Sequence, residues 1–219
     1  MPNGGGRMKK GSKRENNKTV YPRTDLVILA GGQARRMNGI NKLLQKFDEQ
    51  IQLIKIYQQL KPNIAQVWIN SHRDYSIYQK IIPNIYYYQD DETGFQGPLM
   101  GMKSAWSHVQ SDYVLFVPCD VTYIPSKVLL KLHVALAKNN LAEVAYVEIN
   151  GKPLYPFCLV KRSSLVTLNL HIEQEQRSLK HCFSNLHAQV ACFKNPALFF
   201  HSINSLDELQ QYQQLKFLH

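Results

Sequence analysis

The chain has 219 residues, of which 44% are hydrophobic, so it suits one α/β domain with a substantial core and leaves no room for two large domains. No apolar run approaches the ~20 residues of a transmembrane helix, and the first residues lack the apolar segment of a secretory signal. The four cysteines have no C-x-x-C spacing. We therefore interpret them as reduced thiols of a cytoplasmic protein, with zinc binding as the weaker alternative.

The formal net charge of +10 is distributed unevenly. Residues 1–24 carry seven cations and one anion, a net charge of +6, whereas the remainder carries 19 cations and 15 anions, a net charge of +4. A Gly/Lys/Asn-rich segment of this kind cannot bury enough apolar surface to fold, so we predict a disordered basic tail over 1–24 and a single domain over 25–219. The mild charge of that domain favours a binder of phosphorylated small molecules over a nucleic-acid partner.

The first predicted element leads into a glycine-rich loop. The apolar run over 26–30 predicts a buried parallel strand, and Gly31 and Gly32 let the following backbone turn sharply and approach a ligand. Arg35, Arg36 and Lys42 follow, and backbone N–H groups together with such cations are typical of phosphate sites. Gly-Gly alone would equally suit a tight connection, but the combination favours phosphate binding. The patterns of a P-loop and of the dinucleotide fingerprint are both absent.

Short apolar strands then alternate with helices along the chain. We predict helices over 43–60, 75–82, 101–109, 126–138 and 171–183, and strands over 67–69, 85–88, 113–117, 144–149 and 157–160. Asn150-Gly151 predicts a type I′ hairpin, Ser126 an N-cap, and Ser205 with Glu208 a capping box for a last helix. This order predicts an α/β fold, a Rossmann-like three-layer sandwich with a mostly parallel central sheet.

Polar residues follow three of the predicted strands. Asn70, Asp90 and Asp120 stand where these strands end, and Gly97 lies in the next constrained loop. Because the carboxyl ends of parallel strands meet at one edge of a sheet, we expect these residues to converge with the glycine-rich loop. The carboxylate of Asp120 is suited to holding Mg²⁺ against phosphate oxygens, although a lone Asp after a strand is often only a turn former.

The segment LAGGQARRMNGINK resembles the signature loop of nucleotidyltransferases that transfer NMP from an NTP. It is most similar to the molybdenum cofactor guanylyltransferases, whose pattern reads roughly L-A-G-G-x-x-x-R-M-G-G-x-D-K. The segments GPLMG, PCD and the stretch before the last helix are similar to further motifs of that family, so the resemblance runs from about residue 25 to about residue 210. The chain departs from the family at Asn38, Asn41 and Ser202, where Gly, Asp and Asn are usual.

The resemblance implies transfer of GMP from GTP to molybdenum-bearing molybdopterin, with release of pyrophosphate and with Mg²⁺ as cofactor. It assigns catalysis to Arg36, Lys42 and Asp120, and the metal to Asp120. The residues implied to bind GTP are Leu29, Ala30, Gly31, Gly32, Lys42, Asn70, Asp90, Gly97 and Asp120. Those implied to bind the acceptor are Gly101, Ser202 and Asn204.

The implied partners are GTP and a molybdopterin-type substrate, with transient contact to proteins of molybdenum cofactor biosynthesis or to apo-molybdoenzymes, and no membrane. Three alternatives remain open. The first is another nucleotidyltransferase of the same fold that uses CTP, ATP or a sugar-1-phosphate. The second is a nucleic-acid-associated protein that uses the basic tail. The third is a nucleotide-binding regulator without catalysis, which the departures at Asn41 and Ser202 make conceivable.

Overall fold

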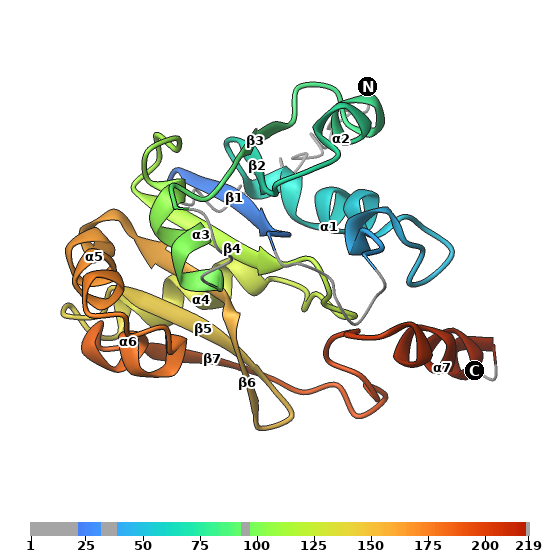
Figure 1. Ribbon diagram of the computed structural model, residues 1–219. Coiled ribbons are helices and arrows are strands. Elements are labelled where there is room, and N and C mark those ends of the chain that lie inside the picture. The colour runs from blue at the N-terminus through green and yellow to red at the C-terminus, as the bar shows by residue number, and fades with distance from the viewer. Residues whose placement is uncertain (1–21, 32–38, 93–96, 218–219) are drawn as a thin grey trace, which may run out of the picture.

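The computed structural model describes residues 22–31, 39–92 and 97–217. Its strands are β1 (Thr24–Leu29), β2 (Val67–Asn70), β3 (Tyr86–Tyr88), β4 (Tyr113–Pro118), β5 (Val144–Ile149), β6 (Lys152–Lys161) and β7 (Gln189–Phe193). They form one sheet of seven strands in the order β3-β2-β1-β4-β6-β5-β7 (Figure 1). Only β6 runs against its neighbours, so the sheet is mostly parallel, as predicted.

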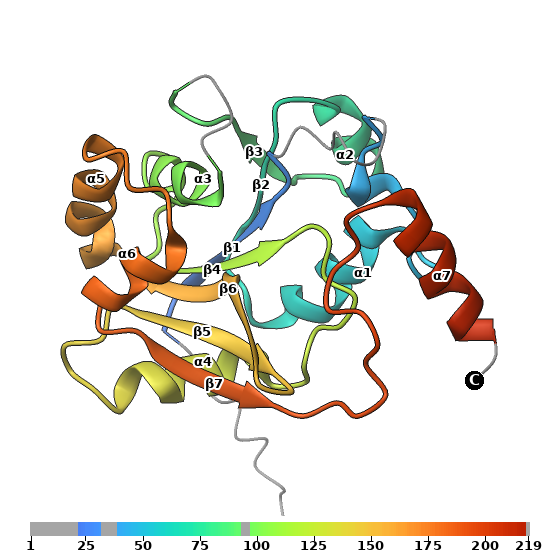
Figure 2. The ribbon, with the colours of Figure 1, turned by 60° about the horizontal axis from the view of Figure 1, so that its bottom comes forward.

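Helices cover both faces of the sheet (Figure 2). The helices are α1 (Gln52–Leu60), α2 (Tyr75–Ile81), α3 (Pro98–Ala105), α4 (Val128–Ala137), α5 (Leu165–Glu173), α6 (Leu179–Asn185) and α7 (Leu206–Phe217). Side chains alternate between the two faces along β1, so that Leu26 and Ile28 join the core under α1 and α4. Val27 and Leu29 join the core under α3, α5 and α6. The fold is therefore the predicted three-layer sandwich. None of the described helices is long and apolar enough to cross a membrane.

Two of the predicted helices were wrong in extent. The region 43–60 is not one helix. It starts with a 3₁₀ turn (Lys42–Leu44), continues in a loop that is closed by an isolated antiparallel β-bridge between Lys46 and Ile51, and becomes α-helical only where α1 begins at Gln52. In place of one helix over 171–183, α5 ends at Glu173 and α6 begins at Leu179. Glu175 adopts a left-handed backbone (φ 55°), which cannot continue a right-handed helix.

The predicted hairpin turn and the Ser205 cap are confirmed, whereas the predicted N-cap at Ser126 is wrong. Asn150 (φ 53°) and Gly151 (φ 79°) both have positive φ, as a type I′ hairpin requires. Ser126 is not the N-cap of α4, because Lys127 with a left-handed backbone (φ 56°) occupies that position. Before α7, the Ser205 hydroxyl accepts a hydrogen bond from the Glu208 amide (3.1 Å), as predicted.

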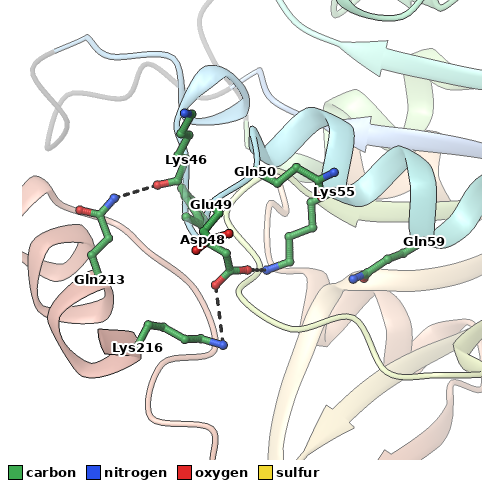
Figure 3. Close-up of a pocket in the computed structure, with 9 residues that line it drawn as sticks. Lys46, Asp48, Glu49, Gln50, Lys55, Gln59, Gln213 and Lys216 are labelled. Atoms are coloured by element: carbon green, nitrogen blue, oxygen red, sulfur yellow. Dashed lines mark hydrogen bonds and ion pairs between the residues drawn. The ribbon is translucent and has the colours of Figure 1, made fainter. Parts of the chain in front are cut away.

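Helix α7 lies at the edge of the molecule beside α1, and both apolar and charged contacts hold it there (Figures 1 and 2). Four buried side chains form a small separate core beneath it: Phe47, Ile203, Leu209 and Tyr212. Asp48 accepts hydrogen bonds from Lys55 (2.5 Å) and Tyr212 (2.8 Å) and lies 3.7 Å from the Lys216 Nζ. Asp48, Lys55 and Lys216 border an open hollow of about 890 Å³ (Figure 3).

Burial alone would raise the pKa of Asp48, but the hydrogen bonds from Lys55 and Tyr212 and the nearby charges of Lys55 and Lys216 lower it below its usual value. Asp48 is therefore ionised at neutral pH and ties α7 to α1. Because the segment that carries Asn204 immediately precedes α7, this attachment also fixes that segment.

Candidate active site

Four loops meet at the carboxyl ends of β1, β2, β3 and β4. In the register of the sheet, Leu29 at the end of β1 pairs with Asn70 of β2 and with Pro118 of β4. The Ala30 amide donates to the Asn70 carbonyl (2.9 Å), and the Cys119 amide donates to the Leu29 carbonyl (3.1 Å). These bonds bring the loops after the three strands to one edge of the sheet, as the sequence predicted.

Lys42 lies at the centre of the first group of polar side chains. Its Nζ atom is 3.2 Å from the Asp120 Oδ2 atom and 3.4 Å from the Asn204 Oδ1 atom. Both charged side chains are mostly buried, with 14% of Lys42 and 20% of Asp120 exposed. They border a small pocket of about 190 Å³, and its lining residues are Leu29, Ala30, Asn41, Lys42, Arg73, Pro118, Cys119 and Asp120.

Asn70 lies at the centre of the second group. Its amide nitrogen donates to Asp90 (2.8 Å), whose other carboxylate oxygen is 3.3 Å from the His72 Nε2 atom. A Cβ atom at Gly101 would lie 2.5 Å from the Asn70 Oδ1 atom, and one at Gly31 would lie 3.0 Å from it. Side chains at these two positions would therefore displace the Asn70 amide. The two glycines, Asn70 and Asp90 form one unit.

Three further predicted residues are placed by the same loops. Gly97 has a positive φ of 84° directly before α3, so glycine eases that turn, but a Cβ there would meet none of the described residues within 4 Å. Ser202 accepts a hydrogen bond from the Asn204 amide group (3.2 Å), and the Asn204 backbone amide donates to Glu208 (2.6 Å). Predictions for Gly32, Arg36 and Asn38 fall outside the described residues.

Asn41, a departure from the family pattern, has a full set of local partners. Its side-chain oxygen accepts from the Leu43 amide (3.0 Å), and its nitrogen donates to Asp74 (2.6 Å) and to the Tyr78 hydroxyl (2.7 Å). An aspartate here would place two carboxylates in contact and repel Asp74. The neutral Asn41 is thus compatible with the carboxylate of Asp74, to which it donates a hydrogen bond.

Helix α1 supports the loop that carries Asp120, which the sequence analysis did not foresee. The fully buried Gln52 donates from one nitrogen to the Cys119 carbonyl (3.2 Å) and to the Val121 carbonyl (2.6 Å), on either side of Asp120. Lys55 donates to the next carbonyl, that of Thr122 (2.8 Å). In the sequence, the only sign that α1 supports this loop is that the polar residues Gln52 and Lys55 stand three positions apart, on the face of an amphipathic helix that is expected to be buried.

Cys119 adds no charge to the pocket. Burial raises the pKa of its thiol to about 12, and the neighbouring Asp120 carboxylate raises it further than Lys42 lowers it. The thiol is therefore protonated at neutral pH. Asp120 is accordingly the carboxylate that borders this pocket among its described lining residues.

A sheet of this order, with glycines and paired charges at the carboxyl ends of its first strands, is the fold of nucleotidyltransferases. The protein named molybdopterin-guanine dinucleotide biosynthesis protein A from Archaeoglobus fulgidus has this fold, with a TM-score of 0.65 over 89% of this chain and 100% of its own, at 18% identity. A family model described as the MobA-like NTP transferase domain matches residues 26–190.

Two relatives have a higher sequence identity to this chain. The molybdenum cofactor guanylyltransferase of Acinetobacter baumannii is 68% identical over 90% of this chain and 94% of its own length. That of Pasteurella multocida is 40% identical over 84% of this chain and 96% of its own length. The chain therefore belongs to the MobA-like NTP transferase family and is a nucleotidyltransferase, which confirms the resemblance noted in its sequence.

Proposed function

We propose that this nucleotidyltransferase transfers GMP from GTP to the terminal phosphate of molybdenum-bearing molybdopterin and releases pyrophosphate. The names of the relatives that are 68% and 40% identical support this choice of substrates. The observation that carries the proposal is the meeting of Lys42, Asp120 and Asn204 at a pocket beside the end of β1. A cation, a carboxylate and an amide oxygen suit a nucleotide and a phosphorylated acceptor better than a hydrolytic triad.

The nucleoside half of GTP is proposed to lie along Leu29, Ala30, Gly31, Gly32, Asn70 and Asp90. Glycines at two of these positions allow close approach of a ligand to the backbone. Lys42, with Arg36 from the glycine-rich loop, is proposed to bind the triphosphate. Gly97, which begins α3, is proposed to shape the wall beside the nucleoside.

Transfer of GMP depends on how the two substrates are positioned, more than on the transfer of a proton. An oxygen of the acceptor phosphate attacks the α-phosphorus of GTP, a new P–O bond forms, the bond from the α-phosphorus to the bridging oxygen breaks, and pyrophosphate leaves with the electron pair. The attacking oxygen is already anionic, so no general base is needed. Lys42 offsets the charge that builds up on the α-phosphate and on the leaving group.

The residues fit Mg²⁺ as a cofactor. Mg²⁺ prefers oxygen ligands and is commonly held by one or two carboxylates together with substrate phosphates, and the partly exposed Asp120 carboxylate borders the pocket. No group of three or more His, Cys, Asp or Glu residues gathers elsewhere in the described part of the chain to hold a metal without substrate. When bound, such an ion would neutralise charge on phosphate oxygens.

The acceptor is proposed to contact Gly101 of α3 and, in the segment before α7, Ser202 and Asn204. Because its substrates are soluble phosphates, we place the reaction in the cytoplasm. Proteins that supply or receive the molybdenum cofactor are the proposed transient partners.

A nucleotide comparison tests the proposal. Pyrophosphate release is measured with GTP, CTP, ATP and UTP, each with Mg²⁺ and molybdenum-bearing molybdopterin. We expect release with GTP, loss of release without the acceptor, and GTP giving the largest rise in melting temperature, since a ligand that binds the native state stabilises it. Preference for CTP or ATP, or binding without turnover, would refute it.

A further inference from the structure

We propose that Arg73 is a further phosphate-binding residue of this site, facing the nucleotide across the pocket from Lys42. The inference rests on the proposed function in that it takes GTP as the ligand. Arg73 lies in the turn between β2 and α2, far in sequence from the glycine-rich loop, yet it lines the same pocket as Lys42, Cys119 and Asp120. Nothing in the sequence pattern singled it out.

The guanidinium of Arg73 is held at the end of the glycine-rich loop. Its Nη1 atom donates to the Gly39 carbonyl (2.5 Å), and its Nε atom lies 3.7 Å from the Asp74 Oδ2 atom. The same Asp74 oxygen accepts from Asn41. A guanidinium has five N–H donors, more than these two contacts use, and 42% of the Arg73 side chain is exposed. The contacts of Arg73 with the described residues therefore leave donors for a ligand in the pocket.

The turn that carries Arg73 is built rigidly. The buried Ser71 hydroxyl donates to the Arg73 carbonyl (3.1 Å) and accepts from the Arg73 amide (3.3 Å). The Tyr75 hydroxyl donates to the Ser71 carbonyl. With the backbone fixed in this way and the guanidinium held by Gly39 and Asp74, less entropy is lost when the side chain binds an anion.

The charge balance of the pocket favours a second cation beside Lys42 when a triphosphate is bound. Of the described residues that line it, Lys42 and Arg73 are the two cations, and the charge of Lys42 is partly offset by Asp120 at 3.2 Å. A triphosphate brings several negative charges, which one paired lysine offsets poorly. The planar guanidinium suits two oxygens of one phosphate, and charge-assisted hydrogen bonds of this kind are stronger than neutral ones.

Equilibrium binding of GTP, guanosine and inorganic pyrophosphate to the Arg73→Ala protein tests the proposal. We expect affinity for GTP and for pyrophosphate to fall about ten-fold or more, the size expected for a lost hydrogen bond to a charged group, with guanosine affinity unchanged. Lys80→Ala removes one positive charge from the exposed side of α2, outside the pocket lining, and should change none of the three affinities.

Arg73→Lys keeps the positive charge but loses the planar guanidinium with its paired N–H donors, so it should reduce the affinity for GTP and pyrophosphate less than Arg73→Ala does. This variant keeps the test decisive if the alanine variant does not fold. Equal losses for GTP and guanosine would mean that Arg73 only braces Gly39, and unchanged pyrophosphate affinity would mean that it meets no phosphate. Either result overturns the inference. If the wild-type protein binds GTP through Arg73 but transfers no GMP, the proposed function fails while the inference stands.

Discussion

Lys42 is the residue on which the two halves of the site depend. It follows the glycine-rich loop, yet its ammonium contacts Asp120 after β4 and Asn204 before α7. A single side chain thereby links segments 78 and 162 residues away. In the proposed function its charge meets the phosphates of GTP, and the Asp120 contact fixes its direction.

Lys42→Ala should slow the transfer step more than it weakens GTP binding, because the lysine opposes charge that develops in the transition state. We expect kcat for pyrophosphate release to fall about 100-fold, by analogy with other lost electrostatic contacts. Steady-state kinetics over a range of GTP concentrations measure this. A rise in KM with unchanged kcat would instead assign Lys42 to ground-state binding.

Several residues of the site were predictable because their position at a strand end decides their place. Asn70, Asp90 and Asp120 each follow a strand of the parallel part of the sheet, and parallel strand ends meet. Gln52 and Arg73 were not predictable in this way. Their contacts are to the backbone of loops distant in sequence, and neither residue type nor spacing reveals such a contact before the fold is known.

At the scale of elements, α1 holds the Asp120 loop and α7 holds the Asn204 segment. Gln52 reaches the carbonyls on either side of Asp120, and Asp48 links α1 to α7. The two helices that support the Asp120 loop and the Asn204 segment are thus connected through one set of polar side chains. The carboxylate and the amide that contact Lys42 are positioned together.

Gln52→Met keeps the volume of the side chain but leaves two buried carbonyls without their donor. We expect unfolding in urea to show a loss of about 1–3 kcal/mol, and the Mg²⁺ concentration for half-maximal activity to rise because Asp120 is less well placed. Gln58→Met, on the exposed face of α1, is the matched control. A stability loss without any change in Mg²⁺ dependence would limit Gln52 to a structural role.

Asp48→Asn tests the attachment of α7 through pH. The pKa of Asp48 is lowered in the folded chain, so its ionisation contributes stability above the unfolded pKa of about 3.9 and loses it as pH falls through the folded value. Urea unfolding should show the variant about 1 kcal/mol less stable at pH 7, with the difference shrinking as pH falls below about 3.9 and vanishing only below the lower folded pKa. A difference independent of pH would exclude this charge effect.

Element boundaries were less predictable than element types. Six strands and the Asn-Gly hairpin were predicted in their places, because short apolar runs and positive φ at the turn are local properties, but β6 (Lys152–Lys161) is longer than the predicted 157–160. The break between α5 and α6 depends on Glu175 adopting a left-handed backbone, which its residue type does not favour. Strand β7 was missed. Its five residues complete the sheet by pairing with β5, a partner 40 or more residues away.

At the scale of the whole molecule, the charge divides between a basic first segment and a mildly basic remainder. The family match begins at residue 26, and the described structure begins at residue 22. The site as described draws on residues from Leu29 to Glu208. The candidate site and most of the net charge are therefore separate in sequence.

Removal of residues 1–21 should leave GMP transfer unchanged and should reduce any salt-sensitive binding to polynucleotides, which basic residues supply without base contacts. Turnover with GTP and gel-shift titration with mixed-sequence DNA, each at two salt concentrations, measure the two effects. Loss of GTP turnover in the shortened chain would show that the first segment belongs to the enzyme.

The most direct test of the central claim follows the α-phosphate of GTP. GTP labelled at that phosphate is incubated with Mg²⁺ and molybdenum-bearing molybdopterin, and label in the pterin product is measured for the wild-type and Asp120→Ala proteins. We predict a labelled guanine dinucleotide with the wild-type protein and about 100-fold or slower labelling with the variant. Absence of labelled product with the wild type, or near-normal labelling by Asp120→Ala, would contradict the account.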